Sequence, residues 1–273
     1  MPSLLFHLLS TAVIAGGAWY QTLEQLDKFP TPGPAIIKAG SFSSNGALKL
    51  KPLTEACLRR IRLAAWITRK LNHKEKLSPQ AGKRLGKELN KLPLCFSTVE
   101  LDIEPLFQYA EWLPLFLNAV RQELSSVRKL HVALEPPAGL EESKWSEEDY
   151  SKILETIDGI DVMLYDTALM FPLSYKKLTE QVVGKLGLLL TKFEKREIWL
   201  GLPTYQDRTK LHSPRVENLI VATEGIKASI APAFCSKNFQ FVFFAGYDMT
   251  PEDKTKADAL GDWLREYCDS IKE

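Results

Sequence analysis

The sequence has almost no net charge, since 35 Lys and Arg residues stand against 34 Asp and Glu residues over 273 positions, a balance of +1. Proteins that bind nucleic acid through its phosphates carry a marked excess of basic residues. Basic residues do cluster locally at positions 59–76, but the apolar residues among them favour a solvated rim. We therefore expect no nucleic-acid partner.

Cysteine and histidine are scarce and dispersed. The four cysteines contain no C-x-x-C pair, and the four histidines contain no pair at helical i, i+4 spacing. The sequence also lacks G-x-G-x-x-G, P-loop and G-x-S-x-G motifs. We expect no metal site and no cofactor, while disulfide pairing of the cysteines stays open. Linkers, low-complexity tracts and internal repeats are absent as well, which predicts a single domain over residues 1–273.

The N-terminus allows two interpretations. Residues 4–17 are an apolar stretch followed by small residues, as in a signal peptide, but no Lys or Arg precedes the stretch. It is too short to cross a membrane as a helix, so no stable membrane span is expected. The alternative makes residues 11–19 the first strand of the fold, which the element count below favours. The compartment, exported or cytoplasmic, stays open, as does the oligomeric state.

The most informative segment that is present reads Phe-Ser-Thr-Val-Glu-Leu-Asp-Ile-Glu at residues 96–104. Glu100, Asp102 and Glu104 occupy every second position, which in a β-strand places them on one face, roughly 6.6 Å apart. Crowded carboxylates raise one another's pKa, and a carboxyl protonated near neutral pH is what a general acid requires. The alternative is an amphipathic edge strand with a solvated acidic face.

Strand and helix signals alternate along the chain, the pattern of a parallel sheet with crossover helices. The predicted strands are residues 11–19, 35–42, 62–68, 96–104, 129–135, 160–166, 197–202 and 239–245. The predicted helices are a short one ending near 29, one from 53, and those at 79–92, 106–124, from 146, 175–193, 214–228 and 251–271. Eight such units predict an α/β fold, a (β/α)8 TIM barrel, in which an irregular N-terminal part is allowed. A single helix over residues 53–71 would instead leave the barrel one strand short.

Three segments resemble motifs of the chitinase-like family 18 glycoside hydrolases. Residues 96–104 resemble the D-x-x-D-x-D-x-E signature of the fourth strand. Residues 163–166, Met-Leu-Tyr-Asp, resemble M-x-Y-D on the sixth strand, and residues 201–205, Gly-Leu-Pro-Thr-Tyr, resemble G-x-P-x-Y on the seventh. The similarity covers about residues 96–247 and keeps the order and spacing of the motifs.

The resemblance implies a retaining mechanism assisted by the N-acetyl group of the substrate. Glu104 matches the general acid, Asp102 the carboxylate that orients the acetamide, and Tyr165 the hydroxyl that donates to the acetamide carbonyl. An oligosaccharide substrate is implied as the partner. The further substrate-binding candidates are Glu100, Asp166, Met163, Glu135, Tyr205 and Tyr247. As alternatives, Met163 and Tyr165 are core residues, Asp166 caps a loop, Tyr205 only packs, and Glu135 is structural.

The sequence departs from the family pattern at several positions. Ser97 and Glu100 stand where the signature has aspartates, so the proton relay below Asp102 is altered. The eighth strand lacks the usual Trp, although Tyr247 could stack on a sugar ring. Two functions therefore compete: a glycosidase acting on β-linked N-acetylhexosamine glycans (chitin fragments, peptidoglycan or N-glycans), favoured by Glu104 and Asp102, and a barrel that binds glycans without hydrolysing them. An unrelated barrel enzyme with a coincidental acidic strand is the third alternative.

Overall fold

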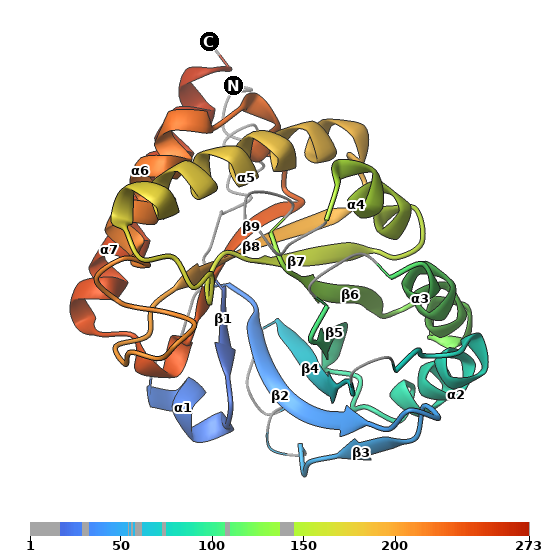
Figure 1. Ribbon diagram of the computed structural model, residues 1–273. Helices are drawn as coiled ribbons and strands as arrows, with labels where there is room; N and C mark the ends of the chain where they lie inside the picture. Colours follow the sequence, from blue (N-terminus) through green and yellow to red (C-terminus); the bar gives the residue numbers. More distant parts are fainter. Residues whose placement is uncertain are drawn as a thin grey trace, which may run out of the picture.

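A computed structural model describes residues 17–28, 33–53, 55, 57, 62–72, 75–106, 110–136 and 145–272. Eight parallel strands form a closed barrel surrounded by helices (Figure 1), which confirms the predicted (β/α)8 architecture. The barrel strands are β1 (Gly17–Tyr20), β2 (Ala35–Phe42), β4 (Leu63–Lys70), β5 (Phe96–Glu104), β6 (Lys129–Leu134), β7 (Gly159–Met163), β8 (Glu197–Pro203) and β9 (Phe239–Phe244). A short strand, β3 (Leu48–Leu50), pairs with β2 in antiparallel orientation outside the barrel.

The four-residue strand β1 closes the barrel. Ala18 pairs with Ala35 of β2 on one side and with Phe243 of β9 on the other, both in parallel register. Closure leaves no free edge among these eight strands, and it encloses the side chains that point inward.

Helices follow most of the strands, and the side chains of Ser78, Ser146, Asn218 and Thr250 each cap the start of one of them. They are α1 (Leu23–Lys28), α2 (Pro79–Leu89), α3 (Trp112–Glu123), α4 (Glu147–Leu154), α5 (Pro172–Lys192), α6 (Leu219–Ser229) and α7 (Pro251–Ser270), with short 3-10 helices η2 (Pro232–Cys235) and η3 (Gly246–Asp248). Ser146 and Thr250 form reciprocal capping boxes at α4 and α7. The predicted starts near Ser146 and Pro251 are confirmed.

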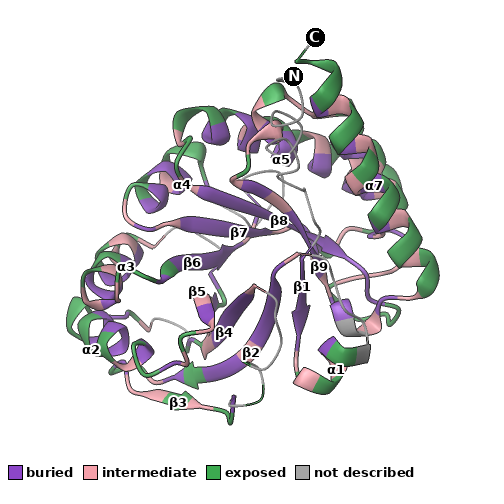
Figure 2. Cartoon of the chain, turned by 180° about the vertical axis from the view of Figure 1, so that it is seen from behind, coloured by how far each residue is buried: buried purple, intermediate pink, exposed green. Residues whose placement is uncertain are grey.

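The strands bury both faces, whereas the helices bury one face and expose the other (Figure 2). The outward strand face is apolar and packs against the helices, as in Leu130, Val132 and Leu134 of β6. The inward face forms a separate cluster: Trp19, Ile36, Ala64, Trp66, Tyr165, Trp199, Tyr205 and Val242. Every inward polar side chain must therefore find its partners among other inward side chains.

Two predicted strands differ from the structure, and one alternative helix is excluded by it. The first strand is Gly17–Tyr20, and residues 11–16 of the prediction lie outside the described residues. The single helix proposed as an alternative for residues 53–71 is wrong, because β4 occupies Leu63–Lys70. The strand predicted to reach Asp166 ends at Met163, and Asp166 adopts a left-handed backbone with φ 55° that takes the chain out of the sheet.

Three helix starts also differ. The predicted helix at 106–124 begins at Trp112, with residues 107–109 outside the described part, and that at 175–193 begins three residues early at Pro172. The helix predicted from Pro214 begins at Leu219, because the Asn218 side chain caps it by accepting from two backbone N–H groups. Glu217, in the preceding turn, is buried. Its tertiary contacts therefore outweigh the preference of Pro214 for the first turn of a helix.

All four cysteines are paired. Cys57 bonds to Cys95, directly before β5, and Cys235 bonds to Cys268 in the last turns of α7. Both bridges cross the part of the barrel where strands begin. Disulfides of this kind are typical of proteins from oxidising compartments.

Replacing Cys235 and Cys268 together by Ser should lower the free energy of unfolding by about 3–4 kcal/mol, because the closed loop of 33 residues no longer restricts the unfolded chain. Urea unfolding of the oxidised wild type and of the double variant measures this difference. Equal urea midpoints for the two proteins would contradict the prediction.

Candidate functional site

The three carboxylates of β5 point into the barrel at successive depths. Glu100 is buried, with 1% of its surface exposed, Asp102 is half-buried, and Glu104 is exposed at the strand's carboxyl end. Active sites of this fold lie at that end of the barrel. The solvated edge strand considered for this segment is wrong, since β5 lies between β4 and β6 inside the barrel.

The two deeper carboxylates each accept a hydrogen bond from an indole. Trp19 Nε1 of β1 donates to Glu100 Oε1 at 2.7 Å, and Trp66 Nε1 of β4 donates to Asp102 Oδ2 at 2.8 Å. Burial raises the pKa of Asp102, while the Trp66 N–H and the positive charge of Lys38 lower it. The Lys38 ammonium lies 5.1 Å from the Trp66 ring. Asp102 is thus held in one orientation beside a cation.

Glu104 has the protonation behaviour of a general acid. Its carboxyl reaches solvent, but the surrounding protein and the nearby charges of Asp102, Asp166 and Glu135, in that order, raise its pKa to about 7. Near neutral pH a substantial fraction of Glu104 therefore carries a proton that it can donate.

Tyr165 lies beside these acids as a phenol that stays protonated. Its ring stacks on Phe244 at 4.3 Å between centroids and meets Trp19 edge-on at 5.9 Å. Burial and then the charges of the nearby carboxylates raise its pKa well above the ordinary value. At neutral pH the hydroxyl is consequently a hydrogen-bond donor.

Gly201 makes this packing possible. A Cβ at Gly201 would lie 2.8 Å from the Tyr165 ring and 3.0 Å from the Trp19 ring, closer than carbon atoms approach. The glycine of the G-x-P-x-Y segment is therefore needed for Tyr165 and Trp19 to meet.

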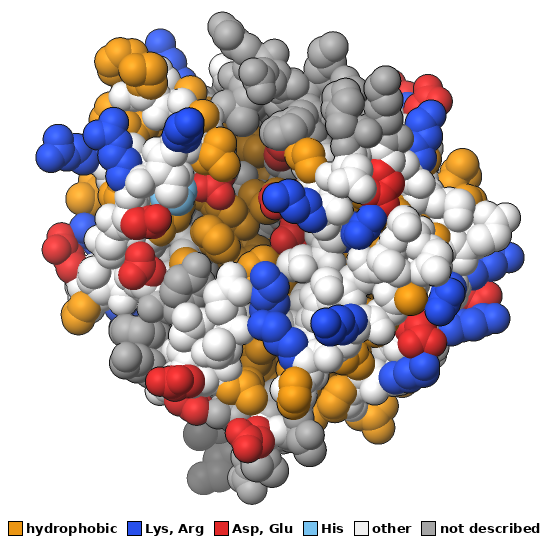
Figure 3. Space-filling model, turned by 60° about the horizontal axis from the view of Figure 1, so that its bottom comes forward, with side chains coloured by type: hydrophobic (Ala, Val, Ile, Leu, Met, Phe, Trp, Pro, Cys, Tyr) orange, Lys and Arg blue, Asp and Glu red, His pale blue; other side chains and the backbone are white. Residues whose placement is uncertain are grey.

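The mouth face of the molecule is hollowed (Figure 3). Hydrophobic side chains cover the floor of the hollow, acidic side chains lie at its edge, and Lys and Arg side chains flank it. Met163 and Phe244 are partly buried and pack against the inward cluster. An apolar floor with few polar groups above it is typical of small-ligand sites.

Two loops at the rim contact each other through hydrogen bonds and a ring stack. Asp166 forms a short contact with His212 Nδ1, and the His212 ring stacks on Tyr205 at 3.8 Å between centroids. The Tyr205 hydroxyl donates to buried Glu217, which also accepts from the Thr167 N–H at 3.0 Å. The structure thus places Asp166 and Tyr205 next to the site with their polar groups already engaged.

The two remaining predicted residues are Glu135 and Tyr247. The charge of Glu135 acts on Glu104, and the backbone carbonyl of Glu135 accepts from the Tyr150 hydroxyl. The side chain of Tyr247 lies outside the described residues.

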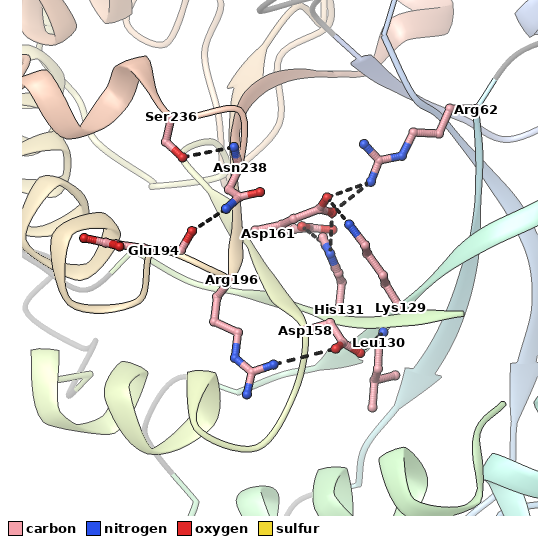
Figure 4. A network of polar contacts seen from close by, with 11 residues as sticks. Arg62, Lys129, Leu130, His131, Asp158, Asp161, Glu194, Arg196, Ser236 and Asn238 are labelled. Carbon is pink, nitrogen blue, oxygen red and sulfur yellow. Dashed lines mark hydrogen bonds and ion pairs between the residues drawn. The ribbon is translucent and has the colours of Figure 1, made fainter. Parts of the chain in front are cut away.

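Below the three acids, a second set of charged side chains fills the barrel interior (Figure 4). His131 Nδ1 lies 2.8 Å from Asp161 Oδ1, and His131 Nε2 lies 3.1 Å from Glu197 Oε2. Glu197 in turn pairs with Arg62 at 2.8 Å and with Lys129 at 2.5 Å. Burial and the Glu197 charge raise the pKa of Asp161 to about 7, although its hydrogen bond with Glu100 lowers it. Burial disfavours the charged form of Glu197, but contacts with His131, Lys129 and Arg62 outweigh it and lower its pKa.

Sequence reasoning missed this lower set, and the period-2 alternation contains the signal that would have found it. In β6, β7 and β8 the outward positions are aliphatic throughout. The intervening positions include His131, Asp161 and Glu197. A charged residue between aliphatic neighbours in a strand buried on both faces must point into the barrel.

The described residues contain no group of three or more His, Cys, Asp and Glu side chains that could hold a metal ion. Nor does any helix in the described part of the chain have the length and apolar character needed to cross a membrane.

Comparisons with known proteins establish the fold. No family model matches the sequence, and no curated protein matches it. Among solved structures, the C-terminal domain of a putative chitinase from Desulfitobacterium hafniense aligns with a TM-score of 0.61 and 12% identity, covering 94% of this chain and 99% of that one. A chitinase from Chromobacterium violaceum gives 0.57 and 11%, covering 90% and 98%. The spore cortex-lytic enzyme SleL of Bacillus cereus gives 0.58 and 11%, covering 88% and 72%.

The buried Asp161 should make stability fall as the pH rises through the acid range. Its pKa is about 7 in the folded protein against an ordinary value of 3.8, so between about pH 4 and pH 7 the folded state binds more protons than the unfolded state. Each such proton changes the free energy of unfolding by at most about 1.4 kcal/mol per pH unit. Glu197, with its lowered pKa, acts in the opposite direction only below its usual value of 4.5.

Urea unfolding of the wild type and of the Glu100→Gln/Asp161→Asn double variant between about pH 5 and pH 7.5 tests this expectation. The variant keeps hydrogen-bonding amides but cannot ionise at these positions, so its stability should fall less steeply. Parallel pH dependences for the two proteins would contradict the assignment.

Proposed function

We propose that this chain is a retaining glycosidase that hydrolyses β-linked N-acetylhexosamine glycans with the assistance of the substrate's own acetamide. The observation that carries the proposal is that Glu104 has a pKa of about 7 at the barrel mouth, with Asp102 and Tyr165 in the same hollow. The likeness in fold to chitinases and a cortex-lytic enzyme supports it.

In the proposed first step, protonated Glu104 donates its proton to the glycosidic oxygen, and the bond between the anomeric carbon and that oxygen breaks. The acetamide carbonyl oxygen of the same sugar attacks the anomeric carbon, so positive charge develops on the acetamide. Asp102 accepts from the acetamide N–H and stabilises that charge, while Tyr165 donates to the acetamide oxygen and orients it.

In the second step, the Glu104 carboxylate accepts a proton from water as the water attacks the anomeric carbon. The acetamide oxygen leaves, and the sugar is released with its original configuration. A single group serves first as acid and then as base, which requires a pKa near the working pH. The value of about 7 for Glu104 meets this requirement.

The second candidate function is glycan binding without hydrolysis. It is favoured by the engagement of Tyr205 with Glu217 and of Asp166 with His212, since these groups are then less available to a sugar. The absence of an eighth-strand Trp also favours it, although Phe244 occupies that strand beside Tyr165.

The Glu104→Gln variant should lower kcat on N-acetyl-chito-oligosaccharides and on muropeptides by roughly 10²–10⁴, because the amide keeps the shape of the side chain but cannot transfer a proton. Product release is measured by chromatography and sugar binding by calorimetry. A wild type that binds the sugars as tightly as the variant and releases no product from either substrate would establish the binding function instead.

The alkaline limb of the pH profile of kcat/KM should fall near pH 7, because Glu104 must be protonated and its pKa is about 7. Glu135→Gln removes a negative charge that raises this pKa, so the limb should move toward lower pH by up to about one unit. An alkaline limb unchanged by Glu135→Gln would argue against Glu104 as the titrating acid.

A further inference from the structure

The rim of the hollow carries large apolar side chains that face solvent. Met170, Phe171 and Leu173 have 78%, 64% and 62% of their surface exposed, and Leu211 has 56%. The first three lie between β7 and the first turn of α5, and Leu211 lies in the loop between β8 and α6. The two segments touch, since the Ala168 N–H donates to the Leu211 carbonyl at 2.6 Å. Neighbouring exposed apolar side chains mark a contact surface, which we call the rim patch.

The apolar side chains of the rim patch face outward because polar contacts fix the inner side of both loops. Thr167 and Tyr205 donate to Glu217, and all three residues are buried. His212 contacts Asp166 and stacks on the Tyr205 ring. Polar groups therefore occupy the buried side of the loops, which leaves the apolar side chains on the solvent side.

Phe171 stands at a position where a polar residue would stabilise the fold more. It is the N-cap residue of α5, and at that position Ser, Thr, Asp or Asn accept hydrogen bonds from the first backbone N–H groups of a helix. Side-chain caps of this kind are present at α2, α4, α6 and α7, but Phe171 provides none at α5. A local preference that is given up at an exposed position indicates a role outside the stability of the fold.

Basic side chains lie next to the rim patch. Arg208 and Lys210 precede Leu211 in the same loop, and Lys177 lies one helical turn after Leu173 on α5. All three basic residues are exposed, and none of them forms an ion pair with another described residue. Lys and Arg side chains also lie beside hydrophobic ones on one side of the hollow in Figure 3.

The acids of the two loops are already engaged. Asp166 and Asp207 both contact His212, and Glu217 is buried and accepts from Thr167. The unpaired charge on the two loops is therefore positive, although the whole chain has a balance of only +1. An apolar surface bordered by unpaired cations is complementary to a partner that is apolar inside and negatively charged at its surface.

We propose that the rim patch docks this chain on an anionic lipid bilayer. The apolar side chains enter the boundary between headgroups and acyl chains, and Arg208, Lys210 and Lys177 bind the phosphates of the lipid headgroups. Because the patch lies at the rim, docking brings the hollow next to the membrane surface. The inference goes beyond the proposed hydrolysis and does not depend on it.

Two other occupants match the rim patch less well. A second copy of the chain that met the patch about a two-fold axis would bring the basic residues of both copies together. An anionic polysaccharide would pair with the basic residues, but its hydroxylated surface would gain nothing from Met170, Leu173 and Leu211.

Flotation of the full chain with vesicles of phosphatidylcholine and phosphatidylglycerol tests the apolar contribution. Phe171→Ser/Leu211→Ser should weaken binding at least about tenfold, because two large apolar side chains no longer enter the membrane. The matched control is Leu94→Ser/Val127→Ser, which removes side chains that are 84% and 69% exposed just before β5 and β6, at the other end of the barrel. The control should bind as the wild type does.

The same assay tests the contribution of charge. Arg208→Gln/Lys210→Gln should weaken binding to the anionic vesicles by roughly 25-fold, since each basic residue near an anionic surface contributes about fivefold. The difference from the wild type should shrink in about 0.5 M salt, which screens exposed charges. Vesicles of phosphatidylcholine alone should bind the wild type more weakly than the anionic vesicles do.

Three outcomes would overturn the proposal. The first is a wild type that does not float with the anionic vesicles, and the second is an equal loss of binding in the Leu94→Ser/Val127→Ser control. The third is a different occupant. It would be shown by binding to the acidic polysaccharide polygalacturonate that is as tight as vesicle binding, both unchanged by Phe171→Ser/Leu211→Ser, or by a dimer in sedimentation that this variant dissociates.

A second measurement does not depend on loss of binding. Phe171→Trp keeps an aromatic side chain in the rim patch, and its added fluorescence should be quenched by anionic vesicles that carry a brominated lipid, whereas that of Leu94→Trp should not. Absence of quenching in Phe171→Trp would contradict membrane docking. No glycan is present in these assays, so a chain that docks but hydrolyses nothing would contradict only the proposed function, and an active chain that never docks would contradict only the proposal made here.

Discussion

Closure of the barrel through β1 is the constraint on which the other features depend. Because β1 pairs with both β2 and β9, the inward face of the strands has no contact with the helices and little with solvent. Buried polar groups on that face have chiefly one another as available partners. That requirement is met in two ways. Trp19 and Trp66 donate hydrogen bonds to the acids of β5, and Glu197 forms ion pairs with its neighbours.

The charge of the carboxylates is reduced in different ways at the two ends of the barrel interior. At the base, Glu197 is surrounded by His131, Arg62 and Lys129, so opposite charges hold it ionised. Toward the mouth, cations are fewer and carboxyls accumulate, so protonation replaces ion pairing as the way to reduce charge. This gradient produces an acid with a raised pKa, Glu104, where solvent can reach it. It comes from the distribution of Lys, Arg and His along neighbouring strands and not from any single residue.

Much of the fold followed from the sequence because the outward strand positions are consistently apolar and several helix starts carry a side-chain cap. Boundaries failed where tertiary contacts outweigh local preference, as at Glu217, whose burial moves the start of α6 to Leu219, and at Asp166, whose left-handed backbone ends β7 early.

The upper part of the site followed from the spacing of Glu100, Asp102 and Glu104. The partners of these acids did not, because Trp19 and Trp66 are 81 and 36 residues away from them and are brought near only by strand order. His131 and Asp161, 30 residues apart, were likewise invisible as a pair.

The two disulfides lie at the end of the barrel where strands begin, since Cys95 directly precedes β5 and Cys235 lies just before β9. The hollow and its loops lie at the other end. The disulfides and the hollow are therefore formed by separate segments of the chain. Loop exchange at the mouth, whether by natural variation or by grafting from a related barrel, leaves the cross-linked end untouched, so the loops around the hollow can be altered without removing either disulfide.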